Sequence, residues 1–343
     1  MGKKCFVALL MVVVMMCACW TGAVAEDERD YQYVLLDDGT IEITNYKGNA
    51  DRLTIPAKIA GKTVTSIGYY AFYSCDSLTS VSIPDSVEQI GTNLFVGCSK
   101  LKIISVSPEH PYFATIDGVL FRKADKALIS YPAGIKSSTY TIPQGIAVIG
   151  DYAFYSCDSL TSVSIPDSVM QIGVNPFTFC SSLKIISASP EHPYFAVIDG
   201  VLFRKADKAL ISYPVGIKSS TYTIPQGIAA IGDSAFSSCD SLTSVTIPSS
   251  VITIGDGAFS SCDSLTSVSI PDSVTSIGDY AFSFCGSLTS VSIPDSVTSI
   301  GDYAFAGCGS LTLTVPRNSY AAEYAKANNI PYTYPDANDW LNN

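Results

Sequence analysis

The sequence predicts a β-rich repeat solenoid of about 11 rungs, each about 23 residues long. Two observations lead to this fold class. Residues 264–282 and 287–305 both read SLTSVSIPDSVTSIGDYAF, without a single difference. In addition, a proline closes a short β-like run at intervals of mostly 22 to 24 residues between Pro56 and Pro316. Catalytic residues each occur once in one geometry, so a chain that copies itself predicts a stacked scaffold.

The repeat unit reads Leu-x-x-Val-x-Ile-Pro-x-x-Val-x-x-Ile-Gly-x-x-Ala-Phe-x-x-Cys. Its first part alternates, as in Val81-Ser82-Ile83, so aliphatic side chains should face one side of a strand and serines the other. Proline ends the strand because it has no N–H to donate. The following Val-x-x-Ile-Gly predicts a second, shorter extended segment, since glycine permits a sharp corner.

The end of each unit, Asp-x-Ala-Phe, predicts a single helical turn with Asp as its N-cap and Phe as a large core residue. One unit alone cannot hide its apolar side chains, but units stacked about 4.8 Å apart bury them against each other in a rod about 50 Å long. The phased phenylalanines are Phe72, Phe95, Phe154, Phe177, Phe236, Phe259, Phe282 and Phe305. The consecutive capping aspartates are Asp233, Asp256, Asp279 and Asp302.

A longer period lies on top of the short one. Residues 101–151 and 183–233 align at an offset of 82 with only four differences, so a block of several rungs has been duplicated. Within each copy, DGVLFRKADKALISYP (117–132 and 199–214) reads as two short strands around a polar turn. These segments predict hairpins that protrude from long rungs, near residues 109–135 and 191–217.

The two ends of the chain differ from the repeats. Residues 1–25 resemble a secretory signal peptide, because two lysines precede an apolar run and Ala23-Val24-Ala25 offers a cleavage site. Residues 26–49 are expected to form an N-terminal cap with a hairpin over 31–44, and residues 50–317 the solenoid. Residues 318–343 are expected to form a C-terminal cap and tail, with Ser319 capping a short helix. The predicted location is therefore secreted or cell-surface.

Charge excludes some classes of partner. The chain has a net charge of −11 and a pI near 4.5, which argues against nucleic acid and against tight adhesion to anionic lipid. After the signal peptide, no stretch reaches the roughly 18 apolar residues that a spanning helix needs. No transmembrane segment is expected in the mature chain.

These repeats resemble the BspA-type leucine-rich repeat family. The resemblance rests on LTSVSIPDSVTSIGDYAFSFC (265–285), its sibling repeats and the DGVLF…YP insert, and it covers nearly all of residues 50–317. It implies a leucine-rich-repeat-like solenoid from a secreted or surface protein with a role in adhesion. The family has no shared catalytic residues, so the resemblance implies neither an enzyme nor a cofactor.

Cysteine and histidine are the residue types most able to carry chemistry here. Each of the eight cysteines after the signal peptide follows a phased Phe by three residues, which leaves disulfides or a ladder of buried thiols open, the thiols being favoured. Neither Cys-x-x-Cys nor a phased His is present, so zinc is not expected. His110 and His192 occupy one position in two copies of SPEHPYFA and are expected to be turn residues.

Three surfaces remain as candidates for ligand binding. Small hydroxyls should line the strand face, a tyrosine set should lie at the turn edge, and basic residues should mark the hairpin tips. Ordinary solvation is the alternative for the hydroxyls and for the basic residues, and packing between turns is the alternative for the tyrosines. The strand-face candidates are Ser267, Ser269, Ser290 and Ser292; the tyrosines are Tyr70, Tyr152, Tyr280 and Tyr303; the basic residues are Arg122, Lys123, Arg204 and Lys205.

The favoured hypothesis is a binding or adhesion module that recognises an extracellular protein or glycan through repeated weak contacts. A structural surface-coat protein without a specific ligand is the alternative, and it predicts self-association with no saturable partner. A β-helical polysaccharide-active enzyme would need a unique cluster of acids and basic residues in one groove, which the repeats do not supply.

Overall fold

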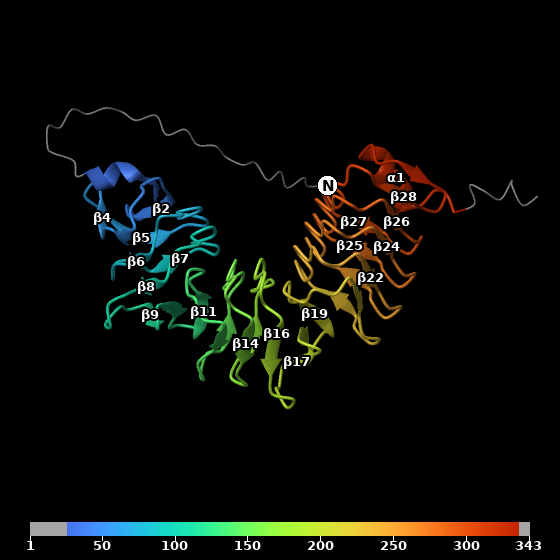
Figure 1. The fold of residues 1–343 in the computed structure, drawn as a ribbon. Coiled ribbons are helices and arrows are strands. Elements are labelled where there is room, and N and C mark those ends of the chain that lie inside the picture. The colour runs from blue at the N-terminus through green and yellow to red at the C-terminus, as the bar shows by residue number, and fades with distance from the viewer. Residues whose placement is uncertain (1–25, 336–343) are drawn as a thin grey trace, which may run out of the picture.

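The computed structural model describes residues 26–335, which form a β-solenoid of about 13 turns curved into an arch (Figure 1). The first strands (blue) and the last strands (red) stand at its two ends. The predicted solenoid is confirmed, with slightly more turns than expected because both caps add one. β2 (Ile41–Tyr46) pairs in parallel with β5 (Lys62–Ile67), as β29 (Tyr332–Thr333) does with β28 (Thr312–Thr314). The predicted signal peptide lies outside the described residues.

The Leu-x-x-Val-x-Ile part of each unit forms a strand on one side of the solenoid. These strands pair in parallel and in register, so Ser267 lies beside Ser290 and Val268 beside Val291. They form three separate sheets. The strands are β3 (Arg52–Thr54), β6 (Ser80–Ser82) and β8 (Ile103–Ser105); β12 (Thr139–Thr141), β14 (Ser162–Ile165) and β16 (Ile185–Ala188); and β20 (Thr221–Thr223), β22 (Ser244–Thr246), β24 (Ser267–Ser269), β26 (Ser290–Ser292), β28 and β29.

The Val-x-x-Ile-Gly part forms the predicted shorter strand on a second side. Most of these strands have two residues and pair in parallel with their neighbours in the stack. Glycine follows each one because the backbone of the preceding rung passes close by: a Cβ on Gly278 would come within 2.6 Å of the Asp256 nitrogen. These strands are β7 (Gln89–Ile90), β13 (Val148–Ile149), β15 (Gln171–Ile172), β21 (Ala230–Ile231), β23 (Thr253–Ile254), β25 (Ser276–Ile277) and β27 (Ser299–Ile300).

The Asp-x-Ala-Phe segments are not helical turns, so this prediction was wrong. The residue after the aspartate is left-handed in most rungs, with φ of 54° at Tyr280, which stops a helix from forming. The turn's N–H groups instead bond the next rung, as in Phe236 N to Ala258 O at 2.8 Å. The aspartate is likewise no N-cap, because Asp256 Oδ1 accepts the Asp279 N–H at 2.8 Å. The turns therefore form a third ladder.

The predicted hairpins exist but are built into the solenoid wall. β9 (Phe113–Ile116), β10 (Val119–Arg122) and β11 (Ala127–Ser130) are antiparallel, and β11 then pairs in parallel with β13. β17 (Phe195–Ile198), β18 (Val201–Arg204) and β19 (Ala209–Ser212) repeat this arrangement in the second copy. In a protruding hairpin, some of the consecutive apolar residues Val119, Leu120 and Phe121 would be exposed. All three are buried, so the hairpins belong to the core.

The core consists of three hydrophobic clusters that follow one another along the chain. The predicted phenylalanines form its spine, with Phe236, Phe259 and Phe282 stacked at centroid distances of 4.9 and 5.1 Å. Burying each ring contributes about 1.5–3 kcal/mol. The stack restarts on a tyrosine after each long rung: Tyr131 stacks on Phe154 and Tyr213 on Phe236.

The long rungs also explain the curvature, which the sequence did not reveal. Figure 1 places β9 and β17 on the outer side of the arch. These strands have no counterpart in the 23-residue rungs, so they add backbone on that side alone. Rungs on either side of each insert therefore splay apart outside and converge inside, where the Asp-x-Ala-Phe turns lie.

Both predicted caps are present. η1 (Glu26–Asp30) leads into β1 (Tyr31–Leu35), which forms a hairpin with β2, and β4 (Lys58–Ile59) pairs with β5. At the other end, α1 (Tyr320–Ala327) covers the last rung. The Ala322 N–H donates to Ser319 Oγ at 3.1 Å, which confirms the predicted N-cap.

The eight cysteines of the described chain are free. Most thiols donate to a carbonyl of the preceding rung, as Cys262 Sγ does to Phe236 O at 3.0 Å. Burial is the first cause that raises the pKa of Cys157 and of Cys239 well above the ordinary value of a thiol. The thiols therefore form a buried ladder, which is the interpretation that the sequence favoured.

Candidate functional site

The site begins with the left-handed residue of the turns. Three tyrosines of the predicted set have nearly the same backbone angle there, with φ of 55° at Tyr70, 53° at Tyr152 and 54° at Tyr280. The following Ala and Phe are fixed in the core, so the tyrosine side chain projects outward from the inner side of the arch. Serine or glycine takes this position in other rungs, as Ser234 and Gly257 show.

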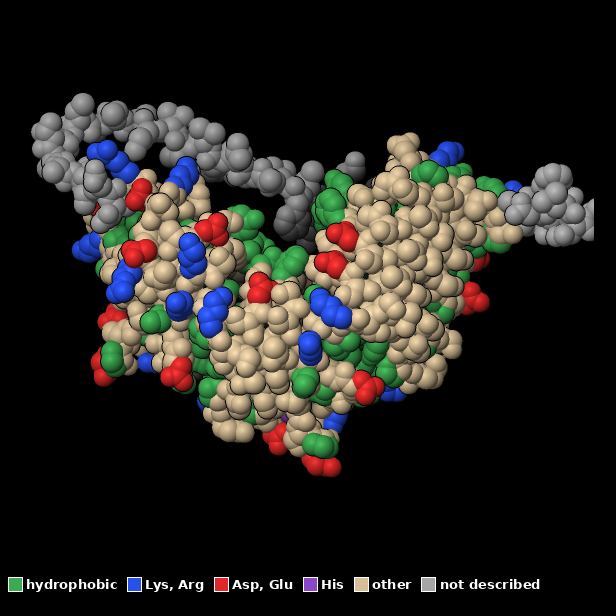
Figure 2. Space-filling view, viewed as in Figure 1, with side chains coloured by type: hydrophobic (Ala, Val, Ile, Leu, Met, Phe, Trp, Pro, Cys, Tyr) green, Lys and Arg blue, Asp and Glu red, His purple; other side chains and the backbone are tan. Residues whose placement is uncertain are grey.

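Because the turns lie on the inner side of the curved arch, these three tyrosines line one hollow of about 480 Å³, although Tyr70 and Tyr280 come from opposite halves of the chain. Tyr155 and Phe179 complete its aromatic wall. Phe179 is 40% exposed and both Tyr70 and Tyr280 are 48% exposed. Figure 2 shows hydrophobic, acidic and basic side chains along this inner side of the arch. Exposed aromatic clusters of this kind mark interaction surfaces.

Burial favours the protonated form of two hydroxyl groups in the hollow, those of Tyr152 and Tyr155. Burial raises the pKa of Tyr155 to about 12 and also raises the pKa of Tyr152. Asn93 Nδ2 donates to the Tyr70 hydroxyl at 3.1 Å and fixes one wall. The tyrosines can therefore offer both a ring face and a hydrogen-bond donor to a ligand.

A ladder of aspartates borders the aromatic wall. Asp233, Asp256 and Asp279 line the hollow, and Oδ1 of each accepts the N–H of the aspartate one rung later, at 2.9, 2.8 and 2.7 Å. Each carboxylate is thereby held in place while its other oxygen is not used in this ladder. Burial, and then the charges of Asp233 and Asp279, raise the pKa of Asp256.

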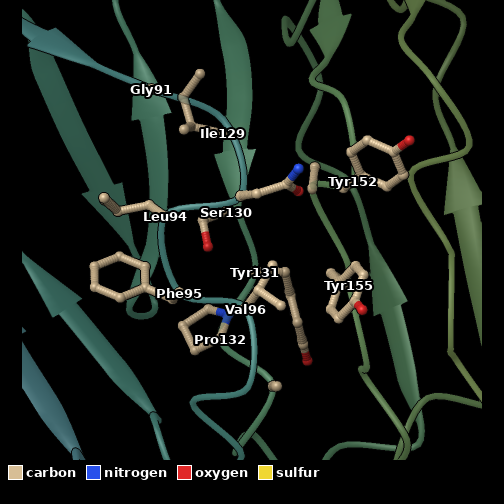
Figure 3. A pocket seen from close by; sticks show the side chains of 13 residues that line it. Gly91, Leu94, Phe95, Val96, Ile129, Ser130, Tyr131, Pro132, Tyr152 and Tyr155 are labelled. Carbon is tan, nitrogen blue, oxygen red and sulfur yellow. The ribbon is translucent and has the colours of Figure 1, made fainter. Parts of the chain in front are cut away.

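A small cavity of about 30 Å³ adjoins the hollow where the first core cluster meets the second. Figure 3 shows it between the turn that carries Leu94 and Phe95 and the segment that carries Ser130 and Tyr131, with Tyr152 beside it. The cavity has room for about one water molecule, so it is a small packing gap between two core clusters and is too small for a ligand.

The other predicted residues lie elsewhere. Tyr303 stacks on Tyr280 at a centroid distance of 5.3 Å but lines a separate hollow with α1. Ser267, Ser269, Ser290 and Ser292 are exposed on the long-strand face, away from the turns.

The basic residues of the inserts are engaged within the chain. Arg122 pairs with Asp125 and Arg204 with Asp207, each at 2.7 Å. Lys123 and Lys205 each donate to the backbone carbonyl of a histidine at 2.6 Å, His110 and His192 respectively. All four candidates therefore have partners within the chain, and their binding to a ligand stays a prediction.

Tyr155 and Phe179 were missed from the sequence. A signal was present for Phe179, because Phe179 and Phe284 stand directly before the cysteine, where Ser156, Ser238 and Ser261 stand in other rungs. An aromatic residue at a position that other rungs fill with serine or glycine, and that is left-handed in all five of these rungs, indicates a surface aromatic and not a core residue.

The histidines serve the fold. His110 and His192 are fully buried, and in both the Nδ1 atom accepts two backbone N–H groups while Nε2 contacts a proline carbonyl at 3.1 Å. Within residues 26–335, no group of His, Cys, Asp and Glu side chains is arranged to hold a metal ion. Over the same range, no helix has the length and apolar character needed to cross a bilayer.

The stacked rungs, phased core and parallel ladders define a repeat solenoid of the leucine-rich-repeat class. The sequence matches the family described as BspA type Leucine rich repeat region over residues 49–137, 131–205 and 215–329. The chain belongs to this family.

Solved structures are similar. A leucine-rich repeat protein from Eubacterium ventriosum is 23% identical with a TM-score of 0.54, over 83% of this chain and 76% of its own. A leucine rich cell surface protein from Faecalibacterium prausnitzii is 28% identical with a TM-score of 0.43, over 86% and 95%. The pneumococcal vaccine antigen PcpA is 18% identical with a TM-score of 0.43, over 89% and 96%. No curated protein matches the sequence.

Proposed function

We propose that this protein is a secreted or cell-surface binding module that holds an extracellular protein or glycan in the inner hollow of its arch. The observation that carries the proposal is the meeting of Tyr70, Tyr152 and Tyr280, from distant rungs, around one hollow of about 480 Å³. Ligand sites are concave, of similar volume and rich in aromatic residues. Membership of a family whose relatives include cell-surface proteins supports the location.

The hollow suits binding better than catalysis. Its polar groups are repeated carboxylates and hydroxyls in equivalent positions, whereas acid–base chemistry needs two groups in different environments. The aromatic side chains instead provide contact area that loses little conformational entropy on binding.

The test is capture of partners from extracellular host and bacterial preparations by residues 26–343. Tyr152→Ser and Tyr280→Ser remove two rings but keep a residue that other rungs accept at this left-handed position, as Ser234 shows. Tyr112→Ser with Tyr194→Ser is the control, because it removes two exposed tyrosine rings that lie outside the hollow. We expect saturable capture that the double variant reduces about tenfold or more and the control leaves unchanged.

Two results would contradict the proposal. Equal capture by the double variant and the wild type would place the binding surface elsewhere. Self-association without any saturable partner would favour a structural coat protein.

A further inference from the structure

We propose that the inner hollow binds a basic segment of a partner protein, with lysine or arginine side chains held between the tyrosine rings and the aspartate ladder. This inference rests on the proposed function and specifies the chemistry of its ligand. The first observation is the exposed aromatic wall itself. Tyrosine faces attract cations that lie within about 6 Å of the ring centroid.

The second observation is charge. The hollow is lined by Asp233, Asp256 and Asp279 and by neither lysine nor arginine. Among residues 26–335, none of these three carboxylates is in an ion pair, since the two pairs present join Arg122 to Asp125 and Arg204 to Asp207. The three carboxylates therefore repel one another, and a bound cation would reduce this repulsion.

Arg204 is a cation beside this ladder, and it limits where the ligand can lie. It shares a smaller hollow of about 270 Å³ with Asp233, on the short-strand side of the turns. Its guanidinium is already held by Asp207. Asp256 and Asp279 lie further along the ladder, so these two carboxylates are the ones we assign to the ligand.

The third observation is that the carboxylates are preorganised. Each uses Oδ1 to accept the N–H of the next rung, which fixes the orientation of the group. A fixed carboxylate loses little side-chain entropy when it pairs with a cation. A neutral glycan would gain the aromatic contacts but would leave the mutual repulsion of the carboxylates in place.

The inference predicts that a fluorescein-labelled peptide of alternating lysine and glycine binds residues 26–343, whereas a glutamate–glycine peptide does not. Binding followed by fluorescence anisotropy should weaken at least tenfold between about 50 and 500 mM salt. A neutral oligosaccharide of N-acetylglucosamine is the competing probe and is expected not to bind.

Asp256→Asn with Asp279→Asn is the decisive variant. The amide oxygen can still accept the N–H of the next rung, so the fold is kept while two charges are lost. Asp272→Asn with Asp295→Asn is the matched control, because it removes two exposed charges from the repeats outside the hollow. We expect the first pair to weaken binding of the lysine peptide about tenfold or more, and the control by less than about twofold.

Circular dichroism melting curves establish that both pairs are folded. Equal loss with both pairs would show general attraction to an acidic protein and would overturn the inference. Binding of the oligosaccharide in the hollow, or absence of lysine-peptide binding while Tyr152→Ser and Tyr280→Ser still abolish partner capture, would overturn this inference but leave the proposed function intact. If the lysine peptide does not bind and the tyrosine variants do not reduce partner capture, both this inference and the proposed function are wrong.

Discussion

Asn175 lies at the boundary between the second and third core clusters. Its replacement tests how much its hydrogen bonds across this boundary stabilise the solenoid. The side chain is buried and makes three hydrogen bonds. Nδ2 donates to Ser234 O at 2.7 Å, while Oδ1 accepts the Ser212 hydroxyl at 2.7 Å and the Phe177 N–H at 3.2 Å. Asn175 thereby ties its turn to the far side of a long rung.

The variant Asn175→Ser should lower the free energy of unfolding by about 2–4 kcal/mol. The shorter side chain cannot span to Ser234, and the buried Ser212 hydroxyl loses its acceptor. Each buried polar group left without a partner costs about 1–3 kcal/mol. Chemical denaturation followed by circular dichroism measures the difference.

Asn93 is a matched control, because it occupies the same repeat position one duplicated block earlier. It makes a single side-chain bond, to the Tyr70 hydroxyl at 3.1 Å, and its buried Oδ1 has no partner. Asn93→Ser should therefore cost only about 0–1 kcal/mol. Equal destabilisation by the two variants would refute the assignment of Asn175 as the tie between segments.

Three other predictions concern the core. Phe259→Ala, which removes a ring stacked on both sides, should cost about 3–5 kcal/mol in denaturation, and a cost below about 1 kcal/mol would exclude a tightly packed spine. Thiol alkylation after unfolding in denaturant without reductant, followed by mass spectrometry, should label all eight repeat cysteines, whereas two unlabelled cysteines per pair would reveal disulfides. Burial lowers the pKa of His110, so the folded state favours neutral imidazole; stability should fall as pH drops below about 6.5, where the unfolded chain takes up a proton first. His110→Gln can accept and donate in the same places without titrating and should flatten this decline, and an unchanged decline would assign it to other groups.

The sequence was sufficient to predict the solenoid, its phased core and both caps. Those features follow from local periodicity, such as the alternation in Val81-Ser82-Ile83 and the recurrence of the phenylalanines. The turn was mispredicted, because Asp-x-Ala-Phe has the composition of a helix start. Its left-handed residue and its hydrogen bonds to the next rung depend on stacking, which one repeat does not encode.

The candidate site was half predicted. The tyrosine positions were identified from the repeat, and Tyr70, Tyr152 and Tyr280 do share one hollow. Their meeting depends on curvature, which arises from hairpins that join the outer wall instead of protruding from it. The repeat period alone predicts a straight rod, so it could not predict that distant rungs converge. It also could not predict that Arg122 forms an ion pair with Asp125.

The most direct test of this account is dityrosine cross-linking of the folded protein, with the joined peptides identified by mass spectrometry. The rings of Tyr280 and Tyr303, 5.3 Å apart, provide an internal positive control. If inner turns from separate segments converge on one hollow, Tyr70 should become joined to Tyr152 or Tyr155, which line it together. Cross-links confined to tyrosines of the same or adjacent rungs would show that these turns do not converge, and that the shared hollow does not exist in solution.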